Sequence, residues 1–508
     1  MKEKVIITRA YQEELIRDPY RPRWHIAFPS DNGMPGDPNG AFFADGVYHL
    51  MYLYRNSETD GFHWGHLSSL DLLHWRQHAD ALSVYGDDKG AYSGGAFVDR
   101  DGTAYLTFWK FGGQKDPVGE RDGVAIAFSK PPYEFFERMG QVAIPSTKLR
   151  GVTDFEINGE VIHTSCGDPS NIWIADGFYY LQTGNKPLLD RFGRGAKAEA
   201  RYMGDFTDLF RSKDLEKWEY VGRFYENDRK GVDGRPDVTE DAMCPSFLPL
   251  YDKKVFGAFT GKYLQLFISH NRGCQYYVGE MDGERFLPEN HGRMSWNHEA
   301  YFAPEALIDD QGRQILWVWI RDNLDDDFKR FSWSGIFSAP RVVWWENEEL
   351  RMAPPEELDR LQYQKMVYEK EDGRAVRVYD GESFRIKGSF LGETRCGLRV
   401  RVSEDGREFT EIYYSPEEGC LVVDATKSGA EGSRVRECAP FSLREGETLS
   451  LDVMVDHSVV EVYANDRQAI SFRIYPTDPK KSKGVELLGE MDQLLHLESY
   501  AMFPTNPY

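Results

Sequence analysis

The chain has 508 residues, of which 41% are apolar, 14% aromatic and 28% charged. One domain seldom exceeds about 250–300 residues, so this length predicts two domains, each with a sizeable core. The 61 basic and 83 acidic residues give a net charge of −22, which disfavours nucleic-acid and membrane partners. No apolar run reaches the roughly 18 residues that a membrane-spanning helix needs.

The N-terminal segment and the cysteines indicate a cytoplasmic location. Residues 1–18 are charged throughout and lack the apolar stretch of a signal peptide. The six cysteines include no C-x-x-C pair and form no dense framework. We therefore expect reduced, mostly buried thiols in a cytoplasmic protein.

Short aromatic and β-branched runs, separated by turns rich in Gly, Asp and Asn, predict an all-β protein. One unit recurs five times: a tight turn leads into an aromatic strand. Asp-Gly turns, which occur in three of the five units, are strong hairpin signals because both residues tolerate positive φ. The five strands that follow the turns cover residues 47–54, 103–109, 178–184, 263–270 and 313–320.

The segment before each turn also repeats. GDPNGAFFADG begins at Gly36 and GDPSNIWIADG begins at Gly167, so the two segments correspond position by position. Counting back from each turn gives five equivalent positions, which are Asp37, Ser93, Asp168, Cys244 and Ala303. Five such units predict a five-bladed β-propeller, in which the equivalent positions of the innermost strands meet at one end of the central axis.

The pattern changes after residue 350. Residues 351–364 read as a connector, and from about residue 366 alternating apolar and polar residues predict a β-sandwich. We place the boundary near residue 355, which divides the chain into a propeller domain (1–355) and a sandwich domain (356–508).

Asp37 and Asp168 are the first candidates for catalysis, because matched positions in two blades would bring their carboxylates together. A third acid is expected from the fourth blade, where Glu240 and Asp241 precede Cys244. Two carboxylates on either side of an acetal are the minimum for glycoside hydrolysis, one attacking the anomeric carbon and the other handling the proton. A solvated acidic loop is the alternative interpretation of residues 240–241.

These motifs, with five blades followed by a sandwich, resemble glycoside hydrolase family 32, the β-fructosidases. The resemblance covers nearly the whole chain and implies that Asp37 is the nucleophile and that Asp168 stabilises the transition state. It depends on the segments Asp37-Pro38-Asn39-Gly40, His63-Trp64-Gly65-His66, Tyr92-Ser93-Gly94, Gly167-Asp168-Pro169, Trp317-Val318-Trp319 and His457–Tyr463.

The chain departs from the family pattern at the acid/base. The family has Glu directly before Cys-Pro, and this chain has Met243 there. We expect Glu240 to be the displaced acid/base rather than Asp241, because neighbouring residues on an extended strand face opposite sides and Glu is the longer. The family's Gln and Arg that contact the sugar are replaced by Leu53 and Gly167.

The resemblance implies a β-fructosidase that cleaves sucrose or short fructans by a retaining double displacement. Asp37, Asp168 and Glu240 would be catalytic, with Asp241 as the alternative acid, and neither a metal nor a cofactor is expected. Residues expected to contact the sugar are Asn39, Trp64, Tyr92, Ser93 and Trp319. Two alternatives stay open: a fructosyltransferase, including one that forms cyclic difructose, and a non-catalytic carbohydrate-binding protein. The sequence leaves open whether the chain is a monomer or a homo-oligomer.

Overall fold

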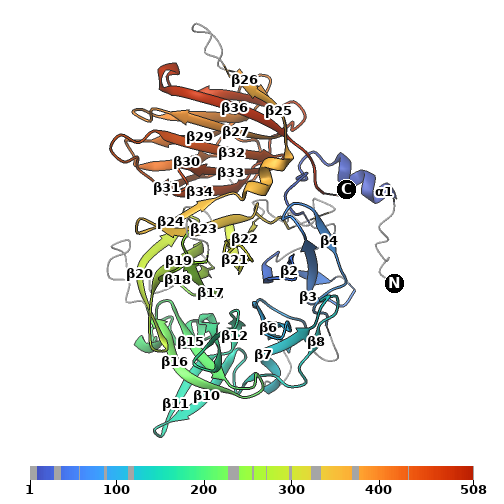
Figure 1. Cartoon of the computed structure of the whole chain (residues 1–508), viewed down its shortest axis with the longest axis vertical. Helices are drawn as coiled ribbons and strands as arrows, with labels where there is room; N and C mark the ends of the chain where they lie inside the picture. The colour runs from blue at the N-terminus through green and yellow to red at the C-terminus, as the bar shows by residue number, and fades with distance from the viewer. Residues whose placement is uncertain are drawn as a thin grey trace.

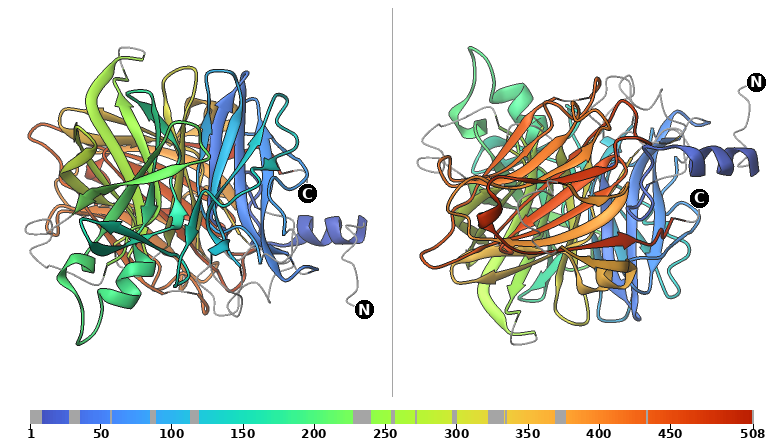
Figure 2. Two further views of the ribbon diagram at one scale, coloured as in Figure 1. Left: turned by 90° about the horizontal axis from the view of Figure 1, so that it is seen from below. Right: turned by 90° about the horizontal axis from the view of Figure 1, so that it is seen from above.

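The computed structural model describes residues 9–27, 36–56, 58–84, 89–112, 119–226, 240–253, 257–270, 272–296, 300–321, 333, 335–368, 377–432 and 434–506. It has two parts, a ring of five β-sheets and a stack of two further sheets above the ring (Figure 1). The all-β prediction is confirmed, since the helices are short. The chain begins with helix α1 (Arg9–Arg17), which lies at the side of the molecule next to the first sheet (Figure 2).

The ring consists of antiparallel sheets that follow one another along the chain. The first contains β1 (Pro38–Ala44), β2 (Val47–Asn56), β3 (Gly61–Ser69) and β4 (Trp75–Gln77). The second contains β5 (Ala96–Val98), β6 (Ala104–Lys110), β7 (Gly119–Ser129), β8 (Glu137–Arg138) and β9 (Ile144–Ser146). The third contains β12 (Gly167–Pro169), β13 (Trp173–Ala175), β14 (Phe178–Gly184), β15 (Phe206–Ser212) and β16 (Trp218–Glu226).

The fourth sheet contains β17 (Met243–Tyr251), β18 (Phe259–Ser269), β19 (Gly273–Asp282) and β20 (Arg285–Arg293). The fifth contains β21 (Tyr301–Ile308), β22 (Gln314–Ile320), β23 (Arg341–Glu346) and β24 (Glu349–Ala353). Between the second and third sheets, β10 (Val152–Ile157) and β11 (Glu160–Ser165) form a separate hairpin. Helix α2 (Lys186–Phe192) and the 3₁₀ helix η1 (Ala200–Tyr202) lie between β14 and β15.

The ring closes because the innermost strands contact one another in a circle. β1 contacts β5, β6 contacts β12, β12 contacts β17, β17 contacts β21, and β21 contacts β1. Polar bonds reinforce these contacts: the Ala41 amide donates to Glu305 Oε1 at 2.9 Å across the closing junction. Asn171 likewise bonds both the amide and the carbonyl of Phe247 in the next sheet. This circle of contacts is the five-bladed propeller that the repeats predict.

The predicted Asp-Gly turns have the backbone that tight hairpins require. Asp45 and Gly46 have φ values of 51° and 78°, and Asp176 and Gly177 have 49° and 77°. Each pair lies between two antiparallel strands, the first between β1 and β2 and the second between β13 and β14. Because few residue types tolerate positive φ, these turns were visible in the sequence.

The equivalent starting positions of the inner strands share a local irregularity. Asp168, Cys244 and Ala303 have φ values of 39°, 48° and 52°, and the strand register shifts at each of them. Such bulges rotate a side chain out of the regular alternation of a strand. At Asp168 and Cys244 the bulge directs the side chain toward the end of the ring axis, whereas Ala303 packs in an apolar cluster.

The second part is a sandwich of two antiparallel six-stranded sheets. One has the order β25 (Gln362–Val367), β36 (Leu494–Met502), β27 (Ser383–Phe390), β32 (Leu449–Asp456), β33 (Val459–Ala464) and β34 (Gln468–Arg473). The other has the order β26 (Arg377–Asp380), β35 (Gly484–Leu488), β28 (Cys396–Val402), β29 (Thr410–Ser415), β30 (Cys420–Asp424) and β31 (Arg436–Pro440). Aliphatic and aromatic side chains from both sheets fill the space between them.

The two domains meet along the fifth blade. The 3₁₀ helix η2 (Glu356–Leu361) follows β24 directly, so the predicted boundary near residue 355 falls between these two elements. A third 3₁₀ helix, η3 (Met491–Gln493), precedes β36. Strand β34 contacts β22 and β24, and apolar residues of both domains share one cluster. In the part of the chain that the structure describes, no helix is long and apolar enough to cross a membrane.

Candidate active site

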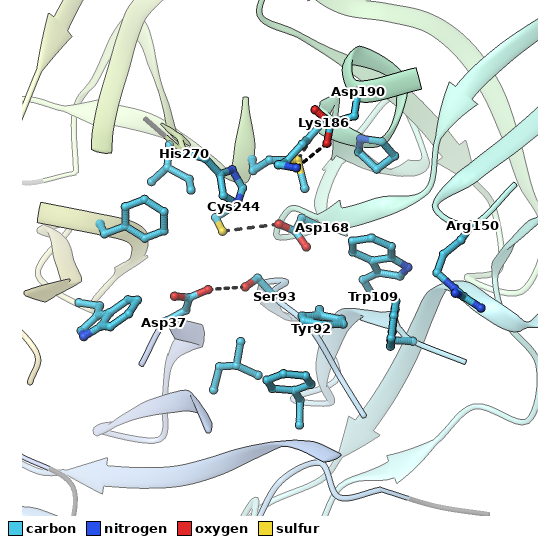
Figure 3. A pocket seen from close by; sticks show the side chains of 18 of the residues that line it. Asp37, Tyr92, Ser93, Trp109, Arg150, Asp168, Lys186, Asp190, Cys244 and His270 are labelled. Atoms are coloured by element: carbon cyan, nitrogen blue, oxygen red, sulfur yellow. Dashed lines mark hydrogen bonds and ion pairs between the residues drawn. The ribbon is translucent and has the colours of Figure 1, made fainter. Parts of the chain in front are cut away.

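A cavity of about 1000 Å³ opens where the inner strands of all five blades begin. Four of the five equivalent positions predicted from the repeats line it, namely Asp37, Ser93, Asp168 and Cys244 (Figure 3). In the fifth blade Phe302 lines the cavity instead of its neighbour Ala303. The repeats therefore predicted which side chains converge, although they lie more than 200 residues apart in sequence.

Asp37 is buried, with 7% of its surface exposed, and is held on one side only. Its Oδ2 accepts a hydrogen bond from Ser93 Oγ at 2.8 Å. Its Oδ1 is buried and has no hydrogen-bond partner in the described structure. The Asp37 carbonyl is fixed by the Leu53 amide at 2.9 Å and by Asn39 Nδ2 at 3.0 Å. A fixed backbone with one unbonded carboxylate oxygen suits a group that attacks a substrate atom.

Asp168 lies across the cavity from Asp37, on β12, and is also 7% exposed. Its Oδ2 accepts a weak hydrogen bond from the Cys244 thiol, with an Oδ2–Sγ distance of 3.6 Å. Figure 3 shows Asp37 and Asp168 on opposite sides of the open space, with Ser93 bonded to the first and Cys244 to the second. The site therefore contains two buried carboxylates that face one volume.

Neither carboxylate has an ion-pair partner within bonding distance in the described structure, and both pKa values are raised. Burial raises the pKa of Asp168 to about 7, with a further contribution from the negative charge of Asp37. Burial also raises the pKa of Asp37, although the Ser93 hydrogen bond and the charges of His270 and Arg321 oppose the shift. Two acids in one low-dielectric site compete for ionisation, so one of them holds a proton up to near-neutral pH.

The structure does not bring Glu240 into the cavity, which corrects the predicted position of this residue. Glu240 is 1% exposed and does not line the cavity. Its carboxylate accepts hydrogen bonds at 2.9 Å from Arg293 and from Gln275 Nε2, and Arg272 lies 3.5 Å away. A carboxylate that is buried outside the cavity and bound in this way cannot reach a leaving group.

Asp241 faces the other side of the chain, toward the cavity, but reaches it only through His270. Asp241 Oδ2 bonds His270 Nδ1 at 2.7 Å, and Asp241 Oδ1 accepts the His270 amide at 3.1 Å. His270 itself lines the cavity. Neither of the two predicted acids therefore lines the cavity: Asp241 bonds the lining residue His270, and Glu240 bonds Gln275 and Arg293.

Two of the expected sugar contacts lie away from the cavity. Trp64 is completely buried in the core that the first two blades share. Asn39 is 1% exposed and joins these blades, because its Oδ1 accepts the Gly94 amide at 3.0 Å. Both side chains support the site rather than line it. The other expected contacts, Tyr92, Ser93 and Trp319, do line the cavity.

The cations around the cavity were not apparent from any sequence motif. Against a chain charge of −22, five of the described lining residues are Arg or Lys: Arg55, Arg150, Lys186, Arg191 and Arg321. They come from different blades and from helix α2, so no local motif reveals them. Arg321 also lies over the rings of Phe302 and Trp319, at 5.0 and 5.6 Å from their centroids.

Among the residues that the structure describes, no group of three or more His, Cys, Asp or Glu side chains could hold a metal ion.

A propeller with two buried carboxylates at the mouth of its axis, followed by a sandwich, defines a class of glycosidases. Comparison with known proteins gives the particular family. The description "Glycosyl hydrolases family 32 N-terminal domain" matches residues 27–354, and "Glycosyl hydrolases family 32 C terminal" matches residues 358–500. The chain belongs to glycosyl hydrolase family 32 and is an enzyme of the β-fructofuranosidase type.

Several curated and solved relatives share this architecture. The chain is 26% identical over 507 residues to the levanase of Bacillus subtilis (strain 168), covering 92% of this chain and 68% of that protein. It is 27% identical to a sucrose-6-phosphate hydrolase of Klebsiella pneumoniae, covering 92% and 91%. The crystal structure of fructan 1-exohydrolase IIa from Cichorium intybus superposes with a TM-score of 0.77 at 19% identity, covering 96% and 98%.

Proposed function

We propose that this enzyme cleaves β-fructofuranosidic bonds of a short fructoside by a retaining double displacement. The observation that carries the proposal is the pair Asp37 and Asp168, two buried carboxylates that face one cavity and have no ion-pair partner among the residues that the structure describes. Relatives in the same family are named levanase and sucrose-6-phosphate hydrolase, which supports a fructosyl substrate.

In this proposal Asp37 is the nucleophile. Its carboxylate attacks C2 of the fructosyl unit, while Ser93 donates a hydrogen bond to Oδ2. Asp168 binds sugar hydroxyl groups and offsets the positive charge that develops on the ring. Trp319 and Tyr92 provide apolar walls for the sugar faces. Leu53 and Gly167 stand where the family has Gln and Arg, so this chain binds the fructosyl unit with fewer polar contacts.

The cations around the cavity favour a substrate that carries negative charge. Arg150, Lys186 and Arg191 lie on one side of the cavity mouth, where α2 adjoins the loop before β10. Lys186 is bonded to Asp190, whereas Arg191 donates to the Arg150 carbonyl at 2.8 Å. A phosphoryl group on the second sugar would meet this cluster. Sucrose 6-phosphate is therefore our preferred substrate, ahead of sucrose and neutral short fructans.

The test is a substrate panel with product analysis. Purified enzyme is incubated with sucrose, sucrose 6-phosphate, 1-kestose, inulin and levan, and free fructose and glucose are measured separately. We expect fructose release, with the highest kcat/KM on sucrose 6-phosphate and a loss of that preference in Arg150→Met and Arg191→Met. Retention at C2 is read by NMR as β-fructofuranose appearing before mutarotation.

The same panel separates the alternative functions. Glucose released in excess over fructose, with formation of longer or cyclic fructosides, would show a fructosyltransferase. Binding of a fructoside without turnover of any substrate would show a carbohydrate-binding protein and contradict the proposal. Trp319 lines the cavity, so tryptophan fluorescence reports binding in either case.

We also propose a cytoplasmic location. All six cysteines are free thiols in the structure, as expected in a reducing compartment. Fractionation of the native source, with detection of the chain by antibody, tests this directly.

A further inference from the structure

We propose that His270, held by Asp241, donates the proton to the leaving oxygen and later takes a proton from the attacking water. This assignment rests on the proposed fructosidase function. It gives the reaction the acid/base that the sequence lacks at the usual place, where Met243 stands.

The need for another group follows from the contacts of the two nearest candidates. Met243 lines the cavity but its thioether has no proton to give. Glu240 is bound by Arg293 and Gln275 at 2.9 Å and does not line the cavity. Neither side chain can act on a substrate oxygen without rearrangement of the fourth blade.

Strand pairing positions His270 for the task. Met243 on β17 pairs with Ile268 on β18, and the same antiparallel register, extended by two residues, places Asp241 opposite His270. Asp241 has the same facing as Met243 because side chains alternate along an extended strand. The two side chains therefore meet at the edge of the cavity rather than in the interior of the blade.

Asp241 fixes the orientation of the imidazole. A carboxylate can only accept, so the 2.7 Å contact puts a proton on Nδ1 of His270. Asp241 also accepts the His270 backbone amide at 3.1 Å, and its own carboxylate is 1% exposed. Nε2 is then the nitrogen left for the cavity, and it has no hydrogen-bond partner in the part of the chain that the structure describes. The His270 side chain is 47% exposed, which gives substrate and water access.

The charged groups around His270 favour its protonated form. Burial lowers its pKa, but the hydrogen bond and the charge of Asp241 more than offset this, and Asp168 adds to the rise. Lys186 on α2 acts in the opposite direction. The edge of the ring faces Phe302, with centroids 6.0 Å apart. In turn, His270 lowers the pKa of both Asp37 and Asp168, which places its charge close to both carboxylates.

The other proton-bearing groups of the cavity fit the role less well. Burial raises the pKa of Tyr92 to about 12, and that of Cys244 lies well above its ordinary value. Groups with such high pKa values are poor donors near neutrality. Asp168, whose raised pKa of about 7 lets it carry a proton near neutrality, is the strongest competitor, and the Asp168→Asn variant tests it.

The two half-reactions balance with these groups. In the first, a carboxylate oxygen of Asp37 forms a bond to C2, the bond from C2 to the leaving oxygen breaks, and the Nε2 proton of His270 moves to that oxygen. In the second, water attacks C2 while its proton moves to Nε2, and the C2–Asp37 ester bond breaks to regenerate the carboxylate. The imidazole ends protonated, as it began.

The experiment compares His270→Asn with wild type on two substrates. Asn keeps a donor toward Asp241 but lacks Nε2. One substrate is the best natural fructoside of the panel, and the other is p-nitrophenyl β-fructofuranoside, whose leaving group needs no proton. We expect a fall of about 10²–10⁴-fold in kcat/KM on the natural fructoside, a fall below about 10-fold on the nitrophenyl substrate, and partial rescue by azide.

Asp241→Asn tests the positioning role through the pH profile. An Asn side chain cannot stabilise the imidazolium as a carboxylate does, so the pKa of His270 falls. We expect the alkaline limb of kcat/KM to move to lower pH and the ¹⁵N-detected titration of His270 to move with it. The matched control is His163→Asn, which breaks a similar pair, His163 Nδ1 to Asp154 at 2.7 Å, on the β10–β11 hairpin away from the cavity lining. Its pH profile should stay that of wild type.

The outcomes separate this inference from the proposed function. Equal losses on both substrates in His270→Asn, or no loss on either, would overturn the inference while leaving the fructosidase function in place. The leaving-group pattern in Glu240→Gln or Asp168→Asn instead would assign the proton to that residue. A wild-type enzyme that cleaves no fructoside would overturn both.

Discussion

The cavity and the domain junction both contain two buried carboxylates, yet the carboxylates behave in opposite ways. In the cavity, Asp37 and Asp168 have raised pKa values, that of Asp168 reaching about 7. At the junction, Asp456 and Glu461 are completely buried and their pKa values are lowered, that of Asp456 to about 2. Burial raises the pKa in all four cases, so their partners decide the sign.

The partners at the junction are a histidine and backbone amides. His25 Nδ1 and Nε2 lie 3.0 Å from Asp456 and Glu461 respectively, which joins the N-terminal segment to both carboxylates of the sandwich. Asp456 also accepts the amides of Arg23 and Trp24. Glu461 accepts the Ala339 amide of the propeller at 2.7 Å.

The comparison distinguishes carboxylates that hold the fold from carboxylates that are available for chemistry. A buried acid with two or more strong donors is fixed in its charged form and contributes to stability. A buried acid with few hydrogen bonds stays available for chemistry and lowers the stability of the fold. Glu240, bound to Arg293, belongs with the junction acids by this criterion even though it adjoins the cavity.

The largest expected effect is the loss of activity in Asp37→Asn. The amide keeps the shape of the side chain but cannot form the bond to C2, so kcat should fall by about 10⁴-fold or more. Because the carboxylate carries no ion pair, the thermal midpoint should stay close to that of wild type. Activity above a tenth of the wild-type value would contradict the assignment of Asp37 as nucleophile.

Disruption of the domain junction should have the opposite effect, a loss of stability rather than a loss of activity. His25→Ala leaves two buried carboxylates without their shared partner, which costs about 3–5 kcal/mol of unfolding free energy. Urea unfolding followed by fluorescence measures the loss. The comparison variant is His74→Ala, whose histidine pairs with Asp71 but is 65% exposed, so its loss should stay within about 1 kcal/mol. Equal losses in the two variants would remove the distinction drawn here.

The contribution of the domain junction to the free energy of unfolding should decrease at acidic pH. Asp456 titrates near pH 2 in the folded chain and near 3.8 when unfolded, so its contribution is complete above about pH 4 and is lost as the pH falls toward 2. Between pH 5 and pH 3 the expected loss is on the order of 1 kcal/mol. Asp456→Asn should be less stable at pH 5 and should lack this part of the acid dependence in urea titrations.

The cavity should show the opposite pH dependence. Asp168 titrates near pH 7 in the folded chain, so the unfolded chain releases this proton first and stability falls as the pH rises from about 4 to 7. Asp168→Asn carries no charge and avoids this cost. We expect the variant to gain about 1 kcal/mol or more over wild type at pH 8 and little at pH 4. A gain that is equal at both pH values would show that charge is not its cause.

The sequence predicted which inner-strand residues converge at the site, but it did not predict the group that transfers the proton. Asp37, Ser93, Asp168 and Cys244 were found because they repeat, and a repeated turn fixes where each inner strand begins. His270 was missed because it follows the end of its strand and carries no motif. A signal was present: if residues 240–243 are extended, Asp241 shares the facing of Met243, and pairing of the two strands brings His270 opposite.

The other wrong or absent predictions concern side-chain packing, which depends on contacts between segments that are distant in the sequence. Trp64 belongs to a motif shared with the family, but it fills the core between two blades. The cations at the cavity mouth come from separate blades and from α2, so they lie near one another only once the ring is closed.

The bulges at the starts of the inner strands have a consequence for how such a site can change. Asp168, Cys244 and Ala303 occupy the same left-handed position in three blades, with an acid, a thiol and a methyl group. The order of the strands is the same around all three side chains. The side chain at this backbone position can therefore differ in its chemistry while the surrounding ring is kept. Ala303 carries no reactive group and packs in the apolar core beside the cavity, where Phe302 takes its place in the lining.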